Sequence, residues 1–291
     1  MINTILLNYN FKIIKIYKGY SDNYFFINNE RIFIKKITNE KIDSLLKIIE
    51  ELYRRNIKVD TFLLNKNNSY FFTYKNDKYI LYKENRYVEK ITLDELKSFW
   101  DVHSNLDSFD IINNWKIEID YIEKNMTEYN KEYEIIKNSI NYFIGMAENS
   151  IELLNLYKHI IISKNDSIGH KHFTNLDASY LDNPFSFIKT NKMYDVALFF
   201  KYSFFNNNVN YNELDMIINN NDEYENAFLF SCLLYPDYYF EMLKNILSSK
   251  EDESSINCYI LKIKTYKKFL QYCQMEIKNN NIIKNLNWIK H

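Results

Sequence analysis

Short aromatic and β-branched runs alternate with polar residues over the first third of the chain. The runs, between residues 11 and 83, are FKIIKIY, NYFFINN, ERIFIKKI, SYFFTYK and KYILYK. Such runs, separated by Asn, Asp, Gly and Lys, are typical of strands joined by hairpin turns. Between the third and fourth runs, NEKIDSLLKIIEELYRRNI carries apolar residues at three- and four-residue intervals, which indicates a helix. The pattern predicts one antiparallel sheet with a single helix packed against it.

After residue 84 the apolar residues follow helical spacing almost throughout. ITLDELKSFWDVH is typical of a capped helix, with Thr92 as the N-cap and Glu95 three residues later at capping-box spacing. Longer amphipathic helices are expected at 118–137, 139–162, 223–249 and 255–278, with short extended pieces around 171–189. We therefore predict an α+β, protein-kinase-like bilobal fold. Its N-lobe, at 1–84, has an antiparallel sheet and one helix, and its C-lobe, at 85–291, is mostly helical.

Composition excludes several classes of function. The chain has 37 Lys and Arg against 38 Asp and Glu, a net charge of -1, so no broad positive field attracts nucleic acid or an anionic bilayer. Cys232, Cys258 and Cys273 follow neither a disulfide framework nor a zinc-binding spacing, which favours a reducing compartment. The sequence has no signal-peptide pattern and no apolar stretch of membrane-spanning length. We expect a protein made in the cytoplasm, without nucleic-acid partners or membrane insertion.

Glycine and proline are scarce, with only 3 and 2 residues respectively. Turns must therefore depend on Asn and Asp, which tolerate a positive φ better than most residues with a side chain. We interpret the Asn runs at 206–208 and 219–221 as loops of this kind.

Several stretches in the second part of the chain point to a family. After FWDVH at 99–103 they are SINYFIGMAENSIELL, GHKHF, DNPFSFIKTNKMYDVALFF and LLYPDYYFEML. In this order, behind a sheet-and-helix lobe, they make the chain resemble the kinase-like proteins of the bacterial endospore coat, of the CotS and YutH type. These proteins share the fold of aminoglycoside and choline phosphotransferases. The resemblance implies synthesis in the cytoplasm, later residence in the spore coat, and other coat or morphogenetic proteins as partners.

The resemblance also assigns catalytic positions, and most of them carry unexpected residues. In active members of the superfamily the catalytic loop begins His-Gly-Asp, and the Asp is the base toward the acceptor hydroxyl. Here His170 matches the first position, His172 stands where the base should be, and Asp177 falls on a metal-binding position. The strand that should end in a metal-binding Asp reads Phe187-Ile188-Lys189-Thr190.

Asp195, in MYDVALFF, does match the superfamily pattern. The resemblance gives it a structural role, at the start of a helix, where it holds the catalytic loop through hydrogen bonds. Magnesium usually needs one or two carboxylate ligands, and Thr190 offers none. We therefore interpret the loop as degenerate.

The nucleotide end of the predicted N-lobe is equally poor in the expected residues. Gly19 is the only glycine where a glycine-rich loop should cover phosphate. Lys35 or Lys36 could form, with Glu50 or Glu51, the ion pair that positions phosphate in active kinases. In a lysine-rich chain, such lysines are more often solvated surface.

Two further interpretations remain open, one for the histidines and one for the aromatic residues of the C-lobe. His170 and His172 could bind a metal ion together with Asp177 or Asp182, although no second His pair or nearby Cys supports this. The aromatic residues of the C-lobe are interpreted as core, or else as a protein-binding surface. They include Tyr235, Tyr238, Tyr239 and Phe240.

The sequence thus predicts a catalytically degenerate, pseudokinase-like protein that acts in the spore coat or its assembly through protein contacts. Under this hypothesis we expect no cofactor and no metal. The alternative is an active ATP- and magnesium-dependent phosphotransferase on a small molecule or a coat protein, using His172 and Asp177. A third hypothesis is a metal-dependent enzyme at the two histidines.

Overall fold

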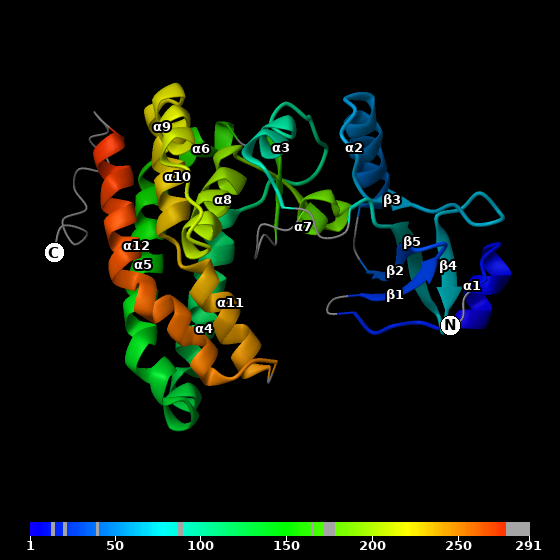
Figure 1. Ribbon diagram of the computed structural model, residues 1–291, viewed down its shortest axis with the longest axis horizontal. Coiled ribbons are helices and arrows are strands. Elements are labelled where there is room, and N and C mark those ends of the chain that lie inside the picture. Colours follow the sequence, from blue (N-terminus) through cyan, green and yellow to red (C-terminus); the bar gives the residue numbers. More distant parts are fainter. Residues whose placement is uncertain are drawn as a thin grey trace. The chain divides into compact units, whose positions relative to one another are not determined.

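The computed structural model describes residues 1–12, 15–19, 22–38, 41–86, 90–164, 166–171, 178–248 and 250–277. Packing divides the chain into two compact units (Figure 1). The first comprises the described residues of Met1–Asp107, His170–His172 and Asp177–Ile188, and so includes the whole sheet-and-helix region expected at 1–84. The second comprises the described residues of Ser108–Gly169 and Lys189–His291.

The first unit is built on the predicted antiparallel sheet. Its strands are β1 (Asn23–Ile27), β2 (Glu30–Ile37), β3 (Thr61–Phe62), β4 (Phe71–Tyr74) and β5 (Asp77–Lys83). They pair in the order β1-β2-β5-β3, and β4 also pairs with β5. Within the described part of FKIIKIY, the strand pairing is a single bridge between Tyr17 and Tyr24, while Ile13 and Ile14 lie outside the described residues.

Asparagine takes the place of glycine in the turns, as predicted. Asn28 and Asn29, between β1 and β2, have φ values of 50° and 67°. The turn between β4 and β5 repeats this geometry at Lys75 and Asn76, with φ values of 50° and 67°. Asn207 also has a positive φ, but the second predicted loop is wrong in part, because Asn219 and Asn220 belong to helix α9 (Tyr211–Asn220).

Helices accompany the sheet in the first unit. The predicted helix is α2 (Ile42–Arg54), whose buried residues follow the expected spacing. An N-terminal helix that the sequence pattern did not predict, α1 (Ile2–Asn8), packs Ile5 with Phe25, Ile32 and Ile34 of the sheet. Since side chains alternate along a strand, Arg31, Phe33 and Lys35 of β2 lie on the opposite face.

The predicted capping box is present at α3 (Leu93–Ser98). Thr92 Oγ1 accepts from the Glu95 amide at 3.3 Å, and the Glu95 carboxylate accepts from the Thr92 amide at 2.7 Å.

Three short elements occur later in the chain: β6 (Ser167–His170), α7 (Ala178–Asp182) and β7 (Phe187–Thr190). β6 and β7 form a separate two-stranded sheet.

The second unit is mostly helical, as predicted. Its helices are α4 (Ile111–Glu132), α5 (Glu134–Leu156), α6 (Lys158–Ser163), α8 (Met193–Phe205), α9, α10 (Glu223–Leu234), α11 (Asp237–Leu247) and α12 (Asn257–Glu276). The single helix expected at 223–249 is wrong: it breaks at Pro236, which has no amide hydrogen to continue the helical pattern. The buried Lys201 Nζ holds this corner, since it donates to the Tyr235 carbonyl at 2.7 Å and to Asp237 Oδ2 at 2.9 Å.

Aromatic rings fill the core of this unit. Tyr235 stacks on Trp115 with 4.0 Å between ring centres, and Tyr239 stacks on Phe143 at 3.7 Å. Tyr238 and Phe240 are buried as well. The core interpretation of these four residues is therefore confirmed, and they do not form a surface for another protein. In the described part of the chain, no helix is both long and apolar enough to cross a membrane.

Candidate functional site

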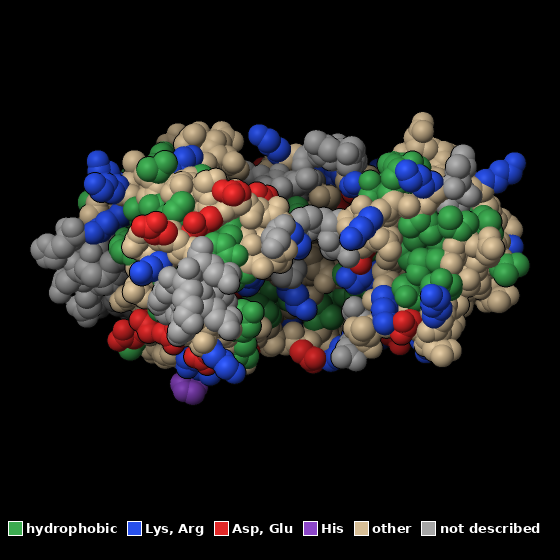
Figure 2. Space-filling model, turned by 90° about the horizontal axis from the view of Figure 1, so that it is seen from below, with side chains coloured by type: hydrophobic (Ala, Val, Ile, Leu, Met, Phe, Trp, Pro, Cys, Tyr) green, Lys and Arg blue, Asp and Glu red, His purple; other side chains and the backbone are tan. Residues whose placement is uncertain are grey.

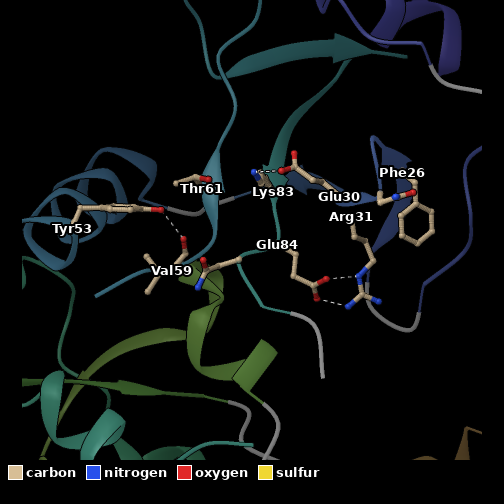
Figure 3. Close-up of a pocket in the computed structure, with 10 residues that line it drawn as sticks. Phe26, Glu30, Arg31, Tyr53, Val59, Thr61, Lys83 and Glu84 are labelled. Carbon is tan, nitrogen blue, oxygen red and sulfur yellow. Dashed lines mark hydrogen bonds and ion pairs between the residues drawn. The ribbon is translucent and has the colours of Figure 1, made fainter. Parts of the chain in front are cut away.

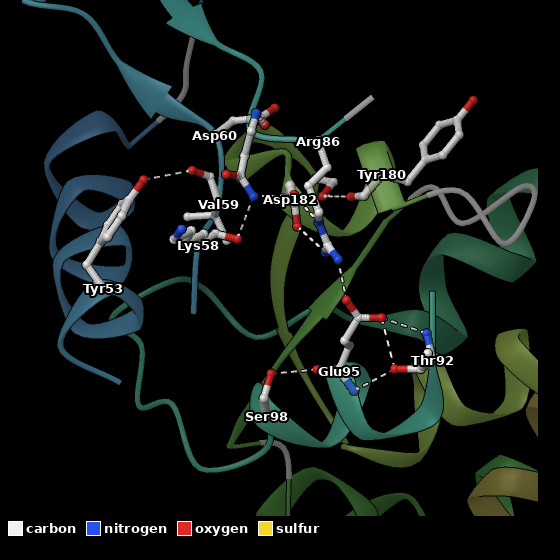
Figure 4. Close-up of polar contacts among 12 residues, drawn as sticks. Tyr53, Lys58, Val59, Asp60, Arg86, Thr92, Glu95, Ser98, Tyr180 and Asp182 are labelled. Atoms are coloured by element: carbon white, nitrogen blue, oxygen red, sulfur yellow. Dashed lines mark hydrogen bonds and ion pairs between the residues drawn. The ribbon is translucent and has the colours of Figure 1, made fainter. Parts of the chain in front are cut away.

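Asp182, at the end of α7, is the centre of a buried polar network in the first unit (Figure 4). Its Oδ1 accepts from Arg86 Nη2 at 2.7 Å, and its Oδ2 accepts from Arg86 Nε at 2.8 Å and from Asn85 Nδ2 at 2.9 Å. Its backbone carbonyl accepts from the Asp60 amide at 2.9 Å. These bonds fix the end of α7 to Asn85 and Arg86 after β5 and to Asp60 just before β3.

Arg86 joins two carboxylates in this network. Beside its two-pronged contact with Asp182, it donates through Nη1 to Glu95, the residue that closes the capping box of α3. The hydrogen bonds to Asp182 raise the pKa of the Arg86 guanidinium. A planar guanidinium can make both contacts at once, which a lysine ammonium cannot do in the same geometry.

Asp60 is a third carboxyl group in the network, and it is buried like Asp182. Its Oδ1 accepts from the Asn85 amide at 2.8 Å, and the residue is only 2% exposed. Burial raises the pKa of Asp60 well above its ordinary value. The hydrogen bond from the Asn85 amide and the charge of Arg31 oppose this shift, whereas the carboxylates of Asp182 and Glu84 add to it. The network therefore contains one carboxyl group whose ionisation is disfavoured by its surroundings.

Phe185, three residues after Asp182, covers the Lys35 face of the sheet. The Asn183 side chain accepts from the Phe185 amide at 3.0 Å, which fixes the turn that carries the ring. The ring centre lies 5.2 Å from that of Phe62 and 5.4 Å from that of Tyr82. Asp182, through this turn, places an aromatic ring against the strands.

Lys35, a candidate phosphate-binding residue, already has neighbours of its own. Its Nζ lies 5.6 Å from the centre of the Phe185 ring and 3.4 Å from Asp22 Oδ1. The Tyr82 hydroxyl donates to the other oxygen of Asp22 at 3.3 Å. A carboxylate held beside this ammonium repels a phosphate that approaches the same point.

The other three candidates for the phosphate site, Lys36, Glu50 and Glu51, have partners or exposure that do not involve Lys35. Lys36 forms an exposed ion pair with Asp77 at 2.7 Å. Glu51 pairs with Arg55 at 2.9 Å, and Glu50 is exposed on α2. Among the ion pairs of the described residues, neither lysine meets either glutamate.

The positions matched to the catalytic loop are only partly described. His170 is completely buried, with its ring edge-on to Phe99 at 5.1 Å and to Phe187 at 5.4 Å. His172 and Asp177 lie outside the described residues. Two members of the proposed metal site are thus outside the described residues, and Asp182, a possible third ligand, uses its oxygens on Arg86 and Asn85. Within the described ranges, no group of His, Cys, Asp and Glu could hold a metal ion.

The end of β7 carries no carboxylate. Lys189 forms an ion pair with Asp166 at 3.3 Å, and Thr190 is buried with 1% exposure. Asp195 lies in the first turn of α8 and is also buried, but the N-cap position belongs to Lys192. Its predicted structural role stays a prediction.

Gly169 of β6 lies where β7 comes closest. A Cβ at this position would be 2.5 Å from Thr190 Cγ2 and 3.3 Å from Asp195 Oδ1. The first distance is shorter than real Cβ contacts, so only glycine fits without displacement of its neighbours.

A hollow of about 370 Å³ lies next to the Asp182 network, between the β1–β2 turn and the end of β5, and Asn85 is part of its lining (Figure 3). Its charged side chains are paired with one another. Arg31 Nε donates to Glu84 Oε2 at 2.7 Å, and Lys83 Nζ donates to Glu30 Oε1 at 2.5 Å. The pairing leaves these charges satisfied by the protein itself.

Sequence reasoning treated Asp182 only as a possible metal ligand and did not single out Arg86, Asp60 or Phe185. One signal was available. The chain has only four arginines among its 37 basic residues, and Arg86 stands alone between Asn85 and Tyr87. An arginine in so lysine-rich a chain indicates a position that needs a two-pronged donor.

A model of one protein family, described as "Spore coat putative kinase YutH", matches residues 3–276. The chain belongs to this family. The predicted resemblance to kinase-like spore coat proteins is thereby confirmed. No curated protein sequence matches the chain significantly.

Solved structures of phosphotransferases have the same fold as this family member. An aminoglycoside phosphotransferase from Alicyclobacillus acidocaldarius superposes with a TM-score of 0.62 at 11% identity, over 94% of this chain and 95% of that chain. The spectinomycin phosphotransferase APH(9)-Ia, in complex with ADP and spectinomycin, gives a TM-score of 0.53 at 14% identity, over 97% and 95%. At such identities the likeness shows the fold alone, and the predicted kinase-like fold is confirmed.

Gly169→Ala is expected to destabilise the protein by about 1–3 kcal/mol, because its methyl group overpacks against Thr190. The control is Gly145→Ala in α5, where a Cβ meets nothing within 4 Å. That change should stabilise by about 0.5–1 kcal/mol, since alanine favours the helix. Denaturant unfolding of both variants measures the difference. Equal free energies of unfolding for the two variants would contradict the close approach at Gly169.

Asp60→Asn is expected to change how stability depends on pH. The folded pKa of Asp60 is raised, so its contribution to stability is present below the ordinary aspartate pKa and is lost as pH rises through the folded pKa. Asparagine keeps the acceptor for the Asn85 amide and does not titrate. The variant should therefore gain stability relative to wild type as pH rises from acid to neutral. Thermal unfolding across pH tests this, with exposed Asp43→Asn as the control; a difference that is constant with pH would refute it.

Proposed function

We propose that this member of the spore coat kinase-like family is catalytically degenerate and acts in the coat, or in coat assembly, through contacts with other coat or morphogenetic proteins. The family supplies the coat setting. The loss of phosphotransfer and the role in protein contacts are our own inference. The alternative is an active phosphotransferase, the activity for which the structurally similar proteins are named.

The surroundings of Lys35 carry this proposal. An active site of this fold needs a strand lysine that contacts phosphate while a glutamate of the neighbouring helix holds its ammonium in place. Lys35 instead lies between the ring of Phe185 and the carboxylate of Asp22. The ring of Phe185 and the carboxylate of Asp22 already contact this ammonium, so a phosphate would have to compete with them for it.

The end of β7 supports the same conclusion. A magnesium ion between the phosphates needs hard oxygen ligands, usually carboxylates. Lys189 and Thr190 occupy the last positions of this strand, and the ammonium of Lys189 is paired with Asp166. The end of the strand itself thus offers an ammonium and a buried hydroxyl but no carboxylate, and the nearby Asp166 is paired with Lys189.

Exposed apolar surface supports a role in protein contacts. Figure 2 shows hydrophobic side chains gathered on one face of the sheet-bearing unit, with Lys and Arg side chains around them. Separately from that patch, single large hydrophobic side chains of this unit are exposed, such as Phe26 of β1 at 49%. Apolar surface of this kind is typical of sites that bind other proteins.

ATP with magnesium is expected to leave the thermal midpoint of the protein unchanged at millimolar concentration. Binding with a dissociation constant a hundredfold below the ligand concentration would stabilise by about 2.7 kcal/mol, which melting detects easily. Lys35→Met is the matched variant. A magnesium-dependent rise in wild type that this variant abolishes, or transfer of labelled phosphate to any acceptor, would favour the active phosphotransferase instead.

A fluorescent fusion of the wild-type protein, followed through sporulation, is expected to concentrate at the forming coat. Lys35→Met should concentrate there equally, because recruitment depends on surface contacts and not on phosphate transfer. Diffuse fluorescence at every stage would refute the coat role. Loss of deposition in a normally folded Lys35→Met variant would argue for chemistry at this site.

A further inference from the structure

The seam between α4 and α5 forms a groove of about 460 Å³ on the helical unit. The two helices follow each other directly through Tyr133 and pack side by side, so they run antiparallel. Lining residues recur at three- and four-residue spacing on both, for example Ile119 and Glu123 on α4 and Ile151 and Asn155 on α5. Each helix therefore presents one continuous ridge to the groove.

The floor and one end of the groove are apolar. Ile119 and Ile151 form the floor and are 6% and 8% exposed. Leu156, at the end of α5, is 63% exposed. A leucine so open to solvent at the end of an apolar floor extends the surface that an apolar partner would cover.

The walls of the groove are acidic. Asp120 and Glu123 line it from α4, and Glu148 and Glu152 line it from α5. Among the ion pairs of the described residues, none involves any of these four carboxylates, and the lining includes a single basic residue, Lys116. Glu148 and Glu152 stand four residues apart on one helix face, where like charges repel each other. A protein with a net charge of only -1 thus holds a local excess of negative charge beside an apolar floor.

We propose that this groove binds a basic amphipathic helix of a partner coat protein. Apolar residues of that helix, at three- and four-residue spacing, would face Ile119, Ile151 and Leu156, and its Lys or Arg residues would meet the carboxylates on either side. A groove between two antiparallel helices has the shape for a third helix. The acidic walls repel nucleic acid and anionic membranes, so a positively charged protein segment is the complementary ligand. The inference rests on the proposed role in protein contacts and names the partner's chemistry.

The direct test uses the full-length protein and two synthetic helical peptides, measured by fluorescence anisotropy. One peptide carries leucines at the stated spacing flanked by lysines, and the other has glutamates in place of the lysines. Wild type should bind the lysine peptide, more weakly as salt rises, and not the glutamate peptide. Glu148→Lys combined with Glu152→Lys should weaken the lysine peptide at least tenfold and create binding of the glutamate peptide. No binding by wild type, or an unchanged preference in the double variant, overturns the proposal.

A matched pair of leucine variants tests the apolar part of the groove. Leu156→Ser should weaken the lysine peptide severalfold, because it removes apolar surface at the end of the floor. Leu261→Ser, at an 80% exposed leucine on α12 outside the groove lining, should leave binding unchanged. Equal effects of the two substitutions would show non-specific association and overturn the proposal.

Deposition in sporulating cells distinguishes a failure of the groove proposal from a failure of the proposed coat role. Wild type is expected at the coat, and the normally folded Glu148→Lys, Glu152→Lys variant is expected to stay diffuse. If both are deposited equally, the groove proposal fails while the coat role stands. If the wild-type fusion itself is diffuse, the coat role fails, and the peptide measurements still decide whether the groove binds basic helices.

Discussion

The buried contact between Asp182 and Arg86 is the constraint on which the first unit depends. A carboxylate that is 1% exposed must have its oxygens satisfied, because an unpaired buried charge costs several kcal/mol, about 3–5 where one partner is lost. Arg86 and Asn85 satisfy Asp182, and the turn that follows carries Phe185 onto the face of Lys35. The geometry that stabilises this segment therefore also places the Phe185 ring beside Lys35.

The choice of arginine in this network is informative because the chain otherwise uses lysine. All four arginines make ion pairs, and Arg31 and Arg86 do so with carboxylates that are almost completely buried. A guanidinium is less strongly hydrated than an ammonium and fits a carboxylate with two parallel hydrogen bonds. The two parallel hydrogen bonds to a buried carboxylate therefore explain why Arg31 and Arg86 are arginines in a chain that otherwise uses lysine.

The protein keeps the fold of the phosphotransferases, and lysines at the end of β7 and on the sheet face form ion pairs within the protein. Gly169 still permits the close approach to Thr190, which is a requirement of shape. The charged groups differ from this: Lys189 pairs with Asp166 and Lys35 pairs with Asp22, so both ammonium groups have partners within the protein. Fold and function are separable in this way because packing constrains the backbone, whereas chemistry depends on a few side chains.

The sequence by itself determined what depends on neighbouring residues: the strand and helix periods, the capping box at Thr92, and the asparagine turns, because these are set by local spacing and backbone preference. It did not determine α1, whose place depends on the sheet face that covers it. The sequence also did not determine the partners of the site residues, because these partners are distant along the chain. Lys35 pairs with Asp22 instead of a glutamate of α2, and Arg86 pairs with a residue 96 positions away. Only the tertiary structure brings such partners together, since the choice among many Lys, Asp and Glu residues depends on distance in space and on burial.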